Sequence, residues 1–343
     1  TVGDGGVAIY SQGGDVNMAA SGTKKIKVGK DARGILVVGD GQNVTATNYE
    51  YEIGDGSYGF VNRNSGSTGN TFTISGGKAT LGNKGKFIYS SDKNRNITNS
   101  TDMEMLSTAT DGENYGIYAT GTVTNSGKIE FTKGKGNVGI YATEDGDITN
   151  SGNIELGESD AANKKYSIGI IAKPGKVTNS GTIKIGDSAN SIDGKDGIGL
   201  FADSENGKNG EIINTGAITT EGDSTIGAYA NASSKISLGA GGDITVKGDK
   251  TTGYYIDQGT GSSIASGVSI DVTGDNANGV FVNKGGLTYE GDTTVTGDGA
   301  YGFVAGKNSS VTANGGSVTV SGASGSSKAT TGTGGRGTAG VVA

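Results

Sequence analysis

Apolar and polar residues alternate in short runs that return at a nearly constant interval along the chain. The clearest run reads GIYA at residues 116–119 and again at 139–142, with apolar residues at its second and fourth positions. Roughly twelve copies follow one another about 27 residues apart, a spacing that indicates stacked structural repeats. Because the alternation has a period of two residues, each copy predicts a short strand with one buried face.

A second run lies between the copies. It reads VTNSGKI at residues 123–129, ITNSGNI at 148–154 and VTNSGTI at 177–183. Each period therefore holds three short strands joined by tight corners, which predicts an all-β parallel β-helix, a solenoid of about twelve turns. Helix signals are absent: the chain contains 67 Gly, and each Gly destabilises a helix interior by about 1 kcal/mol relative to Ala.

The Asn-Ser-Gly corner has a mechanical explanation in this coil. Asn and Gly accept left-handed backbone angles that β-branched residues resist, so we expect such angles at the corner. Stacked turns would bring the Asn residues into register, and their amides could then hydrogen-bond along the stack. We interpret these residues as a structural ladder and not as ligand-binding groups: Asn99, Asn125, Asn150, Asn179 and Asn214.

The third position of the GIYA run has the opposite parity from the buried positions and should face outward. It carries mostly aromatic residues, which stacked turns would align. Ring stacking alone would stabilise neighbouring turns by about 0.5–1.5 kcal/mol per aromatic pair. The alternative is a strip that receives a protein, a sugar or another part of the same chain. The candidate partner-binding face comprises Tyr118, Tyr141, Phe201, Tyr229, Tyr255 and Phe281, and the long variable loops at 158–165 and 187–197 are the second candidate.

Composition and the unbroken repeat together indicate the domain organisation of the chain. Hydrophobic residues make up only 32% of the chain, which is low for a globular domain but sufficient for a thin rod. A single Pro and an unbroken period favour one solenoid over residues 1–320. Residues 321–343 lose the period and are rich in Gly, Ser and Thr, so we expect a flexible exit segment there.

Charge and cysteine content exclude several classes of function. The chain has 28 basic and 35 acidic residues, a net charge of −7, and no basic stripe with interleaved aromatics, so nucleic acid is not expected as a partner. There is no Cys, which excludes disulfides and thiolate metal sites. No apolar run approaches the roughly 18 residues that a membrane-spanning helix needs. We expect no metal and no cofactor.

The alternation of GIYA-like and ITNSGNI-like segments over residues 8–320 resembles the passenger region of large bacterial autotransporter adhesins, most of all the fusobacterial type. The resemblance implies a right-handed β-helix, displayed outside the outer membrane through type V secretion by a C-terminal translocator barrel. That barrel and a signal peptide are missing here. We therefore expect a monomeric fragment of a longer protein, located at the cell surface, either anchored to the outer membrane or secreted.

The same resemblance implies cell adhesion, with a protein or glycan on other bacteria or on host cells as the partner. It carries no catalytic residues over to this chain. The chain contains no His, which excludes Ser-His-Asp and Cys-His chemistry, so we expect no enzyme. One enzymatic alternative stays open: a β-helix polysaccharide lyase or glycoside hydrolase. A glycosidase needs two carboxylates at a fixed separation across a cleft, and no pair stands out among the 35 acidic residues.

Overall fold

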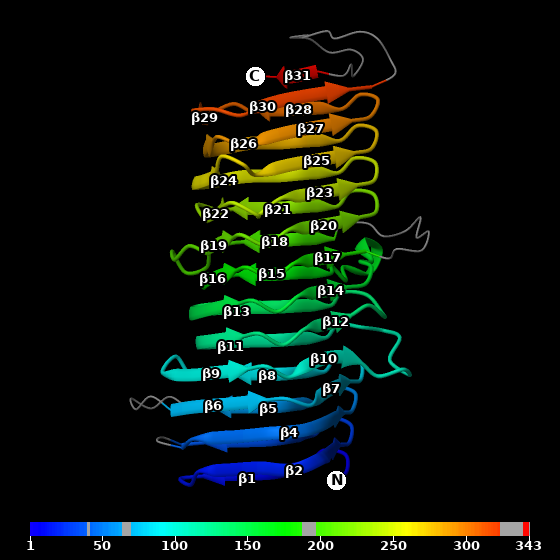
Figure 1. Cartoon of the computed structure of the whole chain (residues 1–343), viewed down its shortest axis with the longest axis vertical. Helices are drawn as coiled ribbons and strands as arrows, with labels where there is room; N and C mark the ends of the chain where they lie inside the picture. Colours follow the sequence, from blue (N-terminus) through cyan, green and yellow to red (C-terminus); the bar gives the residue numbers. More distant parts are fainter. Residues whose placement is uncertain (40–41, 64–69, 187–196, 323–338, 343) are drawn as a thin grey trace.

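The computed structural model describes residues 1–39, 42–63, 70–186, 197–322 and 339–342. These residues form 31 strands and one short 3-10 helix, η1 (Ala161–Asn163). The strands stack in parallel as a β-solenoid of about 11 turns, a rod with the two termini at opposite ends (Figure 1). The all-β parallel coil predicted from the repeat is therefore confirmed, with about 11 turns where the sequence predicted about twelve.

Each turn begins with a strand that carries the GIYA motif or its equivalent. These first strands are β1 (Val7–Gln12), β3 (Arg33–Val38), β5 (Tyr58–Arg63), β8 (Lys86–Ser90), β11 (Tyr115–Asn125), β13 (Val138–Asn150), β15 (Ile168–Ala172), β18 (Ile198–Ala202), β21 (Ile226–Asn231), β24 (Thr252–Ile264), β26 (Asn278–Tyr289), β28 (Tyr301–Ala305) and β31 (Ala339–Val342). In β11, β13, β24 and β26 the first strand runs on into the second.

The remaining strands complete the turns. Separate second strands are β6 (Asn70–Ser75), β9 (Arg95–Asn99), β16 (Lys176–Asn179), β19 (Glu211–Asn214), β22 (Lys235–Leu238) and β29 (Ser309–Ala313). Third strands are β7 (Lys78–Leu81), β10 (Asp102–Met105), β12 (Ile129–Phe131), β14 (Ile154–Leu156), β17 (Ile183–Ile185), β20 (Ile218–Glu221), β23 (Ile244–Lys247), β25 (Ser269–Thr273), β27 (Asp292–Thr296) and β30 (Ser317–Ser321). In β2 (Val16–Val28) and β4 (Val44–Ile53) the second and third strands are continuous.

Each strand pairs in parallel with the equivalent strand of the next turn. In one such step β15 pairs with β18, β16 with β19 and β17 with β20. The same register continues to the C-terminal end, where β31 pairs with β28. Residues 339–342 thus add a strand that the sequence pattern did not predict, while residues 323–338 of the expected flexible segment lie outside the described residues.

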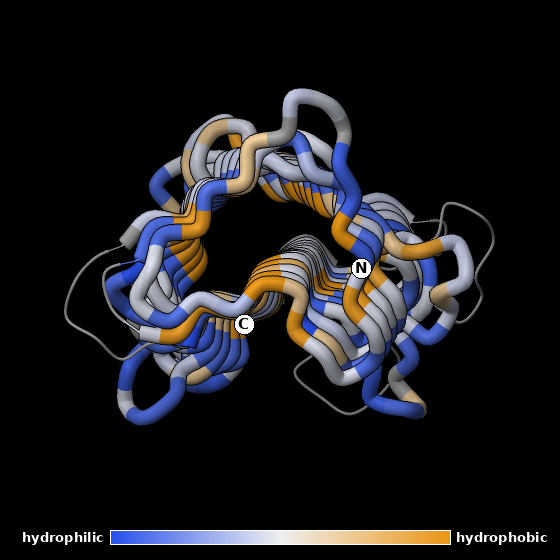
Figure 2. The backbone as a smooth tube through the Cα atoms, turned by 90° about the horizontal axis from the view of Figure 1, so that it is seen from below, coloured by the Kyte–Doolittle hydropathy of each residue, from blue (hydrophilic) through white to orange (hydrophobic). Residues whose placement is uncertain are grey.

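Seen along its axis, the rod shows turns that superpose, with hydrophobic positions repeating in columns (Figure 2). The core consists of these columns. One of them runs through Ile140, Ile170 and Leu200, which are paired in register and have no exposed surface. Hydrophobic side chains at the same position in successive turns give a continuous apolar interior, which explains why a low hydrophobic content is sufficient.

The Gly of the GIYA motif is required by the packing between turns. It is buried in successive copies, next to a buried apolar residue. A Cβ atom on Gly169 would lie 2.6 Å from the carbonyl oxygen of Gly199 and 2.6 Å from Cγ2 of the core residue Ile183. Contacts this short are not tolerated, so only Gly allows the coils to approach at this point.

We therefore predict that Gly169→Ala weakens the rod. Overpacking of a filled interior destabilises proteins by about 1–3 kcal/mol, and the thermal midpoint of unfolding should fall accordingly. Gly14→Ala is the matched control, because a Cβ on Gly14 meets nothing within 4 Å. Equal midpoints for the two variants in a circular dichroism melt would show that the coil spacing adjusts freely.

Candidate functional site

The five corner Asn residues lie in one column inside the rod, and each has no exposed surface. The Nδ2 group of each donates to the Oδ1 atom of the next over 2.7 Å, from Asn99 through to Asn214. Each Nδ2 also donates to the carbonyl oxygen two residues further on, at 2.8 Å from Asn150 to Gly152. The amides therefore satisfy one another and the corner backbone in the absence of water.

The geometry of the corner differs from our expectation in one respect. Neither these Asn residues nor the corner glycines have positive φ angles, so the prediction of left-handed backbone at this corner is wrong. Gly152 is needed for another reason: a Cβ atom there would collide with the carbonyl oxygen of Gly127 in the turn below. The corner uses Gly for close approach between turns, and Asn for its paired donor and acceptor.

Apolar residues occupy the same column beyond the ladder. Asn214 is followed in register by Leu238, Ile264 and Tyr289, while Ile74 precedes Asn99. The Tyr289 hydroxyl donates to the carbonyl oxygen of Ser317 at 2.8 Å, so the buried polar group is again satisfied. The corner thus has two solutions, a hydrogen-bonded amide column and an apolar column.

We predict that Asn150→Ala lowers the free energy of unfolding by about 1–3 kcal/mol, the usual penalty for leaving buried polar partners unpaired. The substitution removes the donor to Asn179 and the acceptor for Asn125. Thr149→Ala, at the exposed neighbouring position, is the control. Urea unfolding should give a lower free energy of unfolding for Asn150→Ala than for Thr149→Ala. If both variants have the same free energy of unfolding as the parent protein, the ladder contributes nothing to stability.

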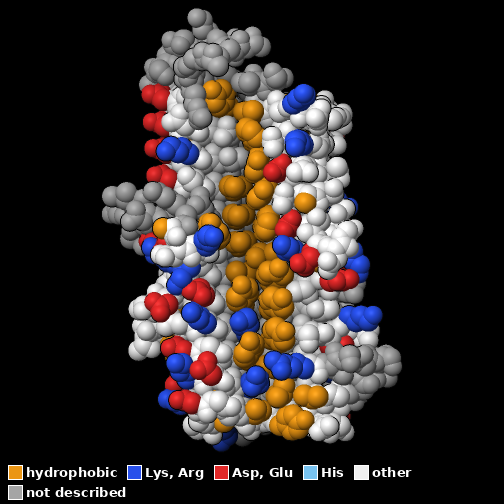
Figure 3. All heavy atoms as spheres, turned by 180° about the vertical axis from the view of Figure 1, so that it is seen from behind, with side chains coloured by type: hydrophobic (Ala, Val, Ile, Leu, Met, Phe, Trp, Pro, Cys, Tyr) orange, Lys and Arg blue, Asp and Glu red, His pale blue; other side chains and the backbone are white. Residues whose placement is uncertain are grey.

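The third positions of the GIYA copies form a second column, on the outer face of the first strands. Strand register places all of them in line: Tyr10, Leu36, Val61, Tyr89, Tyr118, Tyr141, Ile171, Phe201, Tyr229, Tyr255, Phe281 and Val304. In the space-filling view from behind, hydrophobic side chains make a continuous band along the rod (Figure 3). We call this band the apolar strip.

The rings within the strip pack against one another in two groups. Tyr118 lies parallel to Tyr89 and Tyr141, with ring centroids 5.3 and 4.8 Å apart. The other group is Phe201, Tyr229, Tyr255 and Phe281, with successive centroids 5.2, 4.9 and 5.2 Å apart. Ile171 separates the groups and is only 6% exposed. All six residues of the predicted face therefore lie on one surface, each partly exposed.

The strip has a second column that the sequence reasoning missed. It consists of the residue directly before the motif Gly, and it is aligned by the same register: Tyr58, Lys86, Tyr115, Val138, Ile168, Ile198 and Ile226. Tyr115 packs against Tyr118 at 6.0 Å, and Val138 and Ile168 pack with Ile171. The signal was present in the sequence as YGIYA, VGIYA and IGIIA.

Partial burial changes the acidity of the strip tyrosines. Desolvation is the main cause that raises the pKa of Tyr141 and that of Tyr229 to about 12, and neighbouring rings and carboxylates contribute to the same rise. The carboxylates in question are Glu205 and Asp203 for Tyr141, and Asp257 and Asp203 for Tyr229. Asp203 is paired with Lys173 at 3.0 Å and accepts a hydrogen bond from Asn231. Tyr141 and Tyr229 are therefore neutral at physiological pH.

Three carboxylates line one open hollow. Asp111, Glu158 and Asp160 line it together with Lys135 and Lys165. Hydrogen bonds from the Asn163 side chain and backbone hold the pKa of Asp160 below its ordinary value, and Glu158 lies 3.8 Å from Lys135. In the described part of the chain, no group of three or more His, Cys, Asp or Glu is arranged to hold a metal ion.

Comparison of the chain with protein-family models, with curated proteins and with solved structures finds no match. Among the described residues, no helix is long and apolar enough to cross a membrane.

The raised pKa values predict alkaline weakening of the rod. Unfolded tyrosines ionise near pH 10.0, whereas Tyr141 and Tyr229 stay neutral in the fold until about pH 12. The stability that they contribute is therefore intact below pH 10 and is lost between pH 10 and 12. Tyr141→Phe/Tyr229→Phe should flatten the fall of the thermal midpoint over this window. Identical pH profiles for parent and double variant would contradict the assignment.

Proposed function

We propose that this chain is an adhesive segment displayed on a bacterial cell surface, in a protein of the autotransporter adhesin type. It attaches the cell to a protein or glycan on another bacterium or on a host cell, or it spaces such an attachment, without enzymatic activity. The observation that carries the proposal is the apolar strip, a band of hydrophobic side chains along the rod that includes two groups of partly exposed aromatic residues.

The strip has the chemistry of a contact surface. Aromatic residues are enriched in interfaces because they bury a large area and keep few rotatable bonds. A monomeric soluble protein rarely exposes a long contiguous apolar patch without a partner. The repeat also presents similar side chains in successive turns, so weak contacts at several turns can act together.

The polysaccharide lyase or glycoside hydrolase alternative has weaker support. A glycosidase acid catalyst needs a raised pKa so that it holds a proton near neutral pH. In the carboxylate-lined hollow the pKa of Asp160 is shifted in the opposite direction. Elsewhere lysine partners lower the pKa of Glu52 and that of Glu113. These ion-paired groups favour a solvated, structural role.

Cell binding by the purified chain tests the proposal. Fluorescently labelled protein should bind bacterial or host cells saturably, and Tyr141→Ser/Tyr229→Ser should reduce that binding by at least about tenfold, equivalent to about 1.4 kcal/mol. The expected loss reflects removal of one ring from each aromatic group. Circular dichroism melts of the same preparation separate lost binding from lost structure.

The matched control is Thr124→Ala/Thr149→Ala, which changes two exposed residues in the later parts of β11 and β13, outside the strip. It should bind like the parent protein. Retained binding in the tyrosine variant would move the contact to the loops, of which 158–165 is described and 187–196 lies outside the described residues. Turnover of a polysaccharide by the parent protein would overturn the non-enzymatic assignment.

A further inference from the structure

An open hollow of about 490 Å³ lies beside the apolar strip, where the two aromatic groups are interrupted. Its apolar wall consists of strip residues: Tyr115, Val138, Ile168 and Ile171. The last three are exposed by only 4%, 9% and 6%, although they belong to the outer face of the sheet. The hollow therefore has an apolar floor that is almost fully buried.

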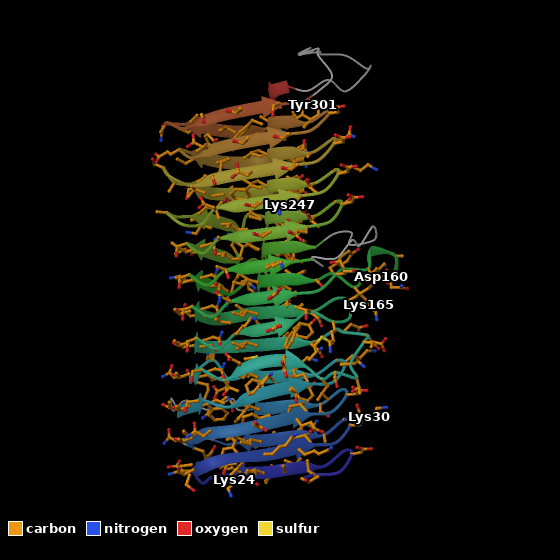
Figure 4. All side chains as sticks on the ribbon, turned by 45° about the vertical axis from the view of Figure 1, so that its right-hand side comes forward. Lys24, Lys30, Asp160, Lys165, Lys247 and Tyr301 are labelled. Atoms are coloured by element: carbon orange, nitrogen blue, oxygen red, sulfur yellow. The ribbon has the colours of Figure 1, made fainter. Side chains whose placement is uncertain are left out.

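An ordered loop forms the opposite wall. Lys164, Lys165 and Tyr166 line the hollow from the segment before β15. The segment is held by a bridge between Asp160 and Lys165 and by a 2.9 Å hydrogen bond from the Asn163 side chain to Asp160. Figure 4 places Asp160 and Lys165 on the loops that project from the rod. Local hydrogen bonds therefore hold this wall of the hollow in place.

Lys86 is the unusual group in this hollow. Its Nζ atom lies 5.2 Å from the ring centroid of Tyr58 and 5.1 Å from that of Tyr115. Burial lowers the pKa of this ammonium group. No described carboxylate lies within ion-pair distance of it, whereas Lys165 contacts Glu113 at 2.7 Å. Lys86 is therefore a half-buried cation, held by two rings, whose charge no acidic side chain balances.

The hollow as a whole is positive in an acidic protein. Four lysines, Lys84, Lys86, Lys164 and Lys165, line it against one acid, Glu113, although the chain carries a net charge of −7. Such a local excess attracts an anion and strengthens its binding once bound, because the walls exclude part of the water. A neutral ligand would leave the Lys86 charge unbalanced.

We propose that this hollow binds a carboxylate-bearing pyranose, that is, a uronic or sialic acid residue of a glycan. The sugar carboxylate pairs with the Lys86 ammonium, and a C–H face of the ring packs on Tyr115 and the aliphatic floor. Glu113 contacts Lys165 through Oε1 and Lys84 through Oε2, and the remaining lone pairs of its carboxylate accept hydrogen bonds from sugar hydroxyls. The inference rests on the proposed adhesive function in that it names one ligand class for the surface.

The size of the hollow fits this ligand. Small-molecule sites are typically about 300–1,000 Å³ and are largely apolar, with a few placed polar groups. An open site of about 490 Å³ accommodates one or two sugar rings and leaves room for the glycan to continue into solvent. The combination of a ring face, an aliphatic floor and a cation matches an acidic sugar better than a simple anion, which would not use the apolar wall.

The test uses matched glycosides with the intact chain. Methyl β-D-glucuronide carries a carboxylate where methyl β-D-glucoside carries a hydroxymethyl group, and the two are otherwise identical. The methyl glycoside of N-acetylneuraminic acid is tested as a second acidic ligand. Saturation-transfer NMR and calorimetric titration should show binding of at least one acidic glycoside and at least about tenfold weaker binding of the neutral one. The acidic glycoside that binds identifies the class of sugar. The proposal is overturned if neither acidic glycoside binds, or if the neutral glycoside binds as tightly as the acidic ones.

Variants assign the binding to this hollow. Lys86→Met keeps an unbranched side chain between the two rings but removes the charge, and should weaken the acidic glycoside by at least about tenfold. Lys176→Met, at an exposed site on β16, should change nothing. Tyr115→Phe keeps the ring face and should retain binding, whereas Tyr115→Leu should lose it. Unchanged binding in folded Lys86→Met overturns the site.

The two proposals fail separately. Cell binding that depends on Tyr229 but persists in Lys86→Met, with no acidic glycoside bound by the parent, would remove the sugar site and leave the adhesive strip. Glycoside binding by the parent with no binding to cells would overturn the adhesive role and leave the site.

Discussion

The structure depends on the backbone hydrogen bonds between parallel strands of successive turns. Parallel pairing holds neighbouring strands about 4.7–4.9 Å apart and puts like positions directly over one another. Any residue type that recurs with the period therefore meets itself. This constraint produces amide contacts of 2.7 Å between Asn150 and Asn179, and ring spacings of 4.8 Å between Tyr118 and Tyr141. The same spacing demands Gly where a carbonyl of the next turn leaves no space for Cβ.

The repeat was sufficient to predict the architecture, because an alternating pattern with a fixed period has few other solutions. It also predicted which Asn residues and which outward rings share a column, since register follows from the period alone. The second column of the strip was missed for a physical reason. Strict alternation puts Tyr115 on the same side as Ile117, but Gly116 and Ile117 are both buried. This irregularity at the Gly returns Tyr115 to the outer face.

Long-range polar contacts were beyond the pattern. Asn62 begins a wholly polar run in the sequence, yet it is buried in β5. Arg95, from the following turn, is fully buried. Its guanidinium donates to the Asn62 side chain at 3.1 Å and to the Gln42 carbonyl at 2.7 Å. Such a contact joins residues from three turns and depends on loop geometry that has no periodic signature. Lys86 is similar, because its sequence neighbours give no sign of the two rings around it.

The inner and outer columns of the solenoid have different roles, and this difference bears on function. In a solenoid the stability is approximately a sum of terms within turns and between nearest neighbours, so the inner columns can hold the rod while the outer face varies. The strip uses this freedom unevenly. Where rings stack without interruption, the surface is regular and suits contacts repeated along the rod. At Ile171 the stack stops, the outer face is covered on one side by the loop before β15, and a charged hollow opens beside it. Within the described residues, a repeat of similar turns thereby gains a local hollow at which, as we propose, an acidic sugar is distinguished from a neutral one.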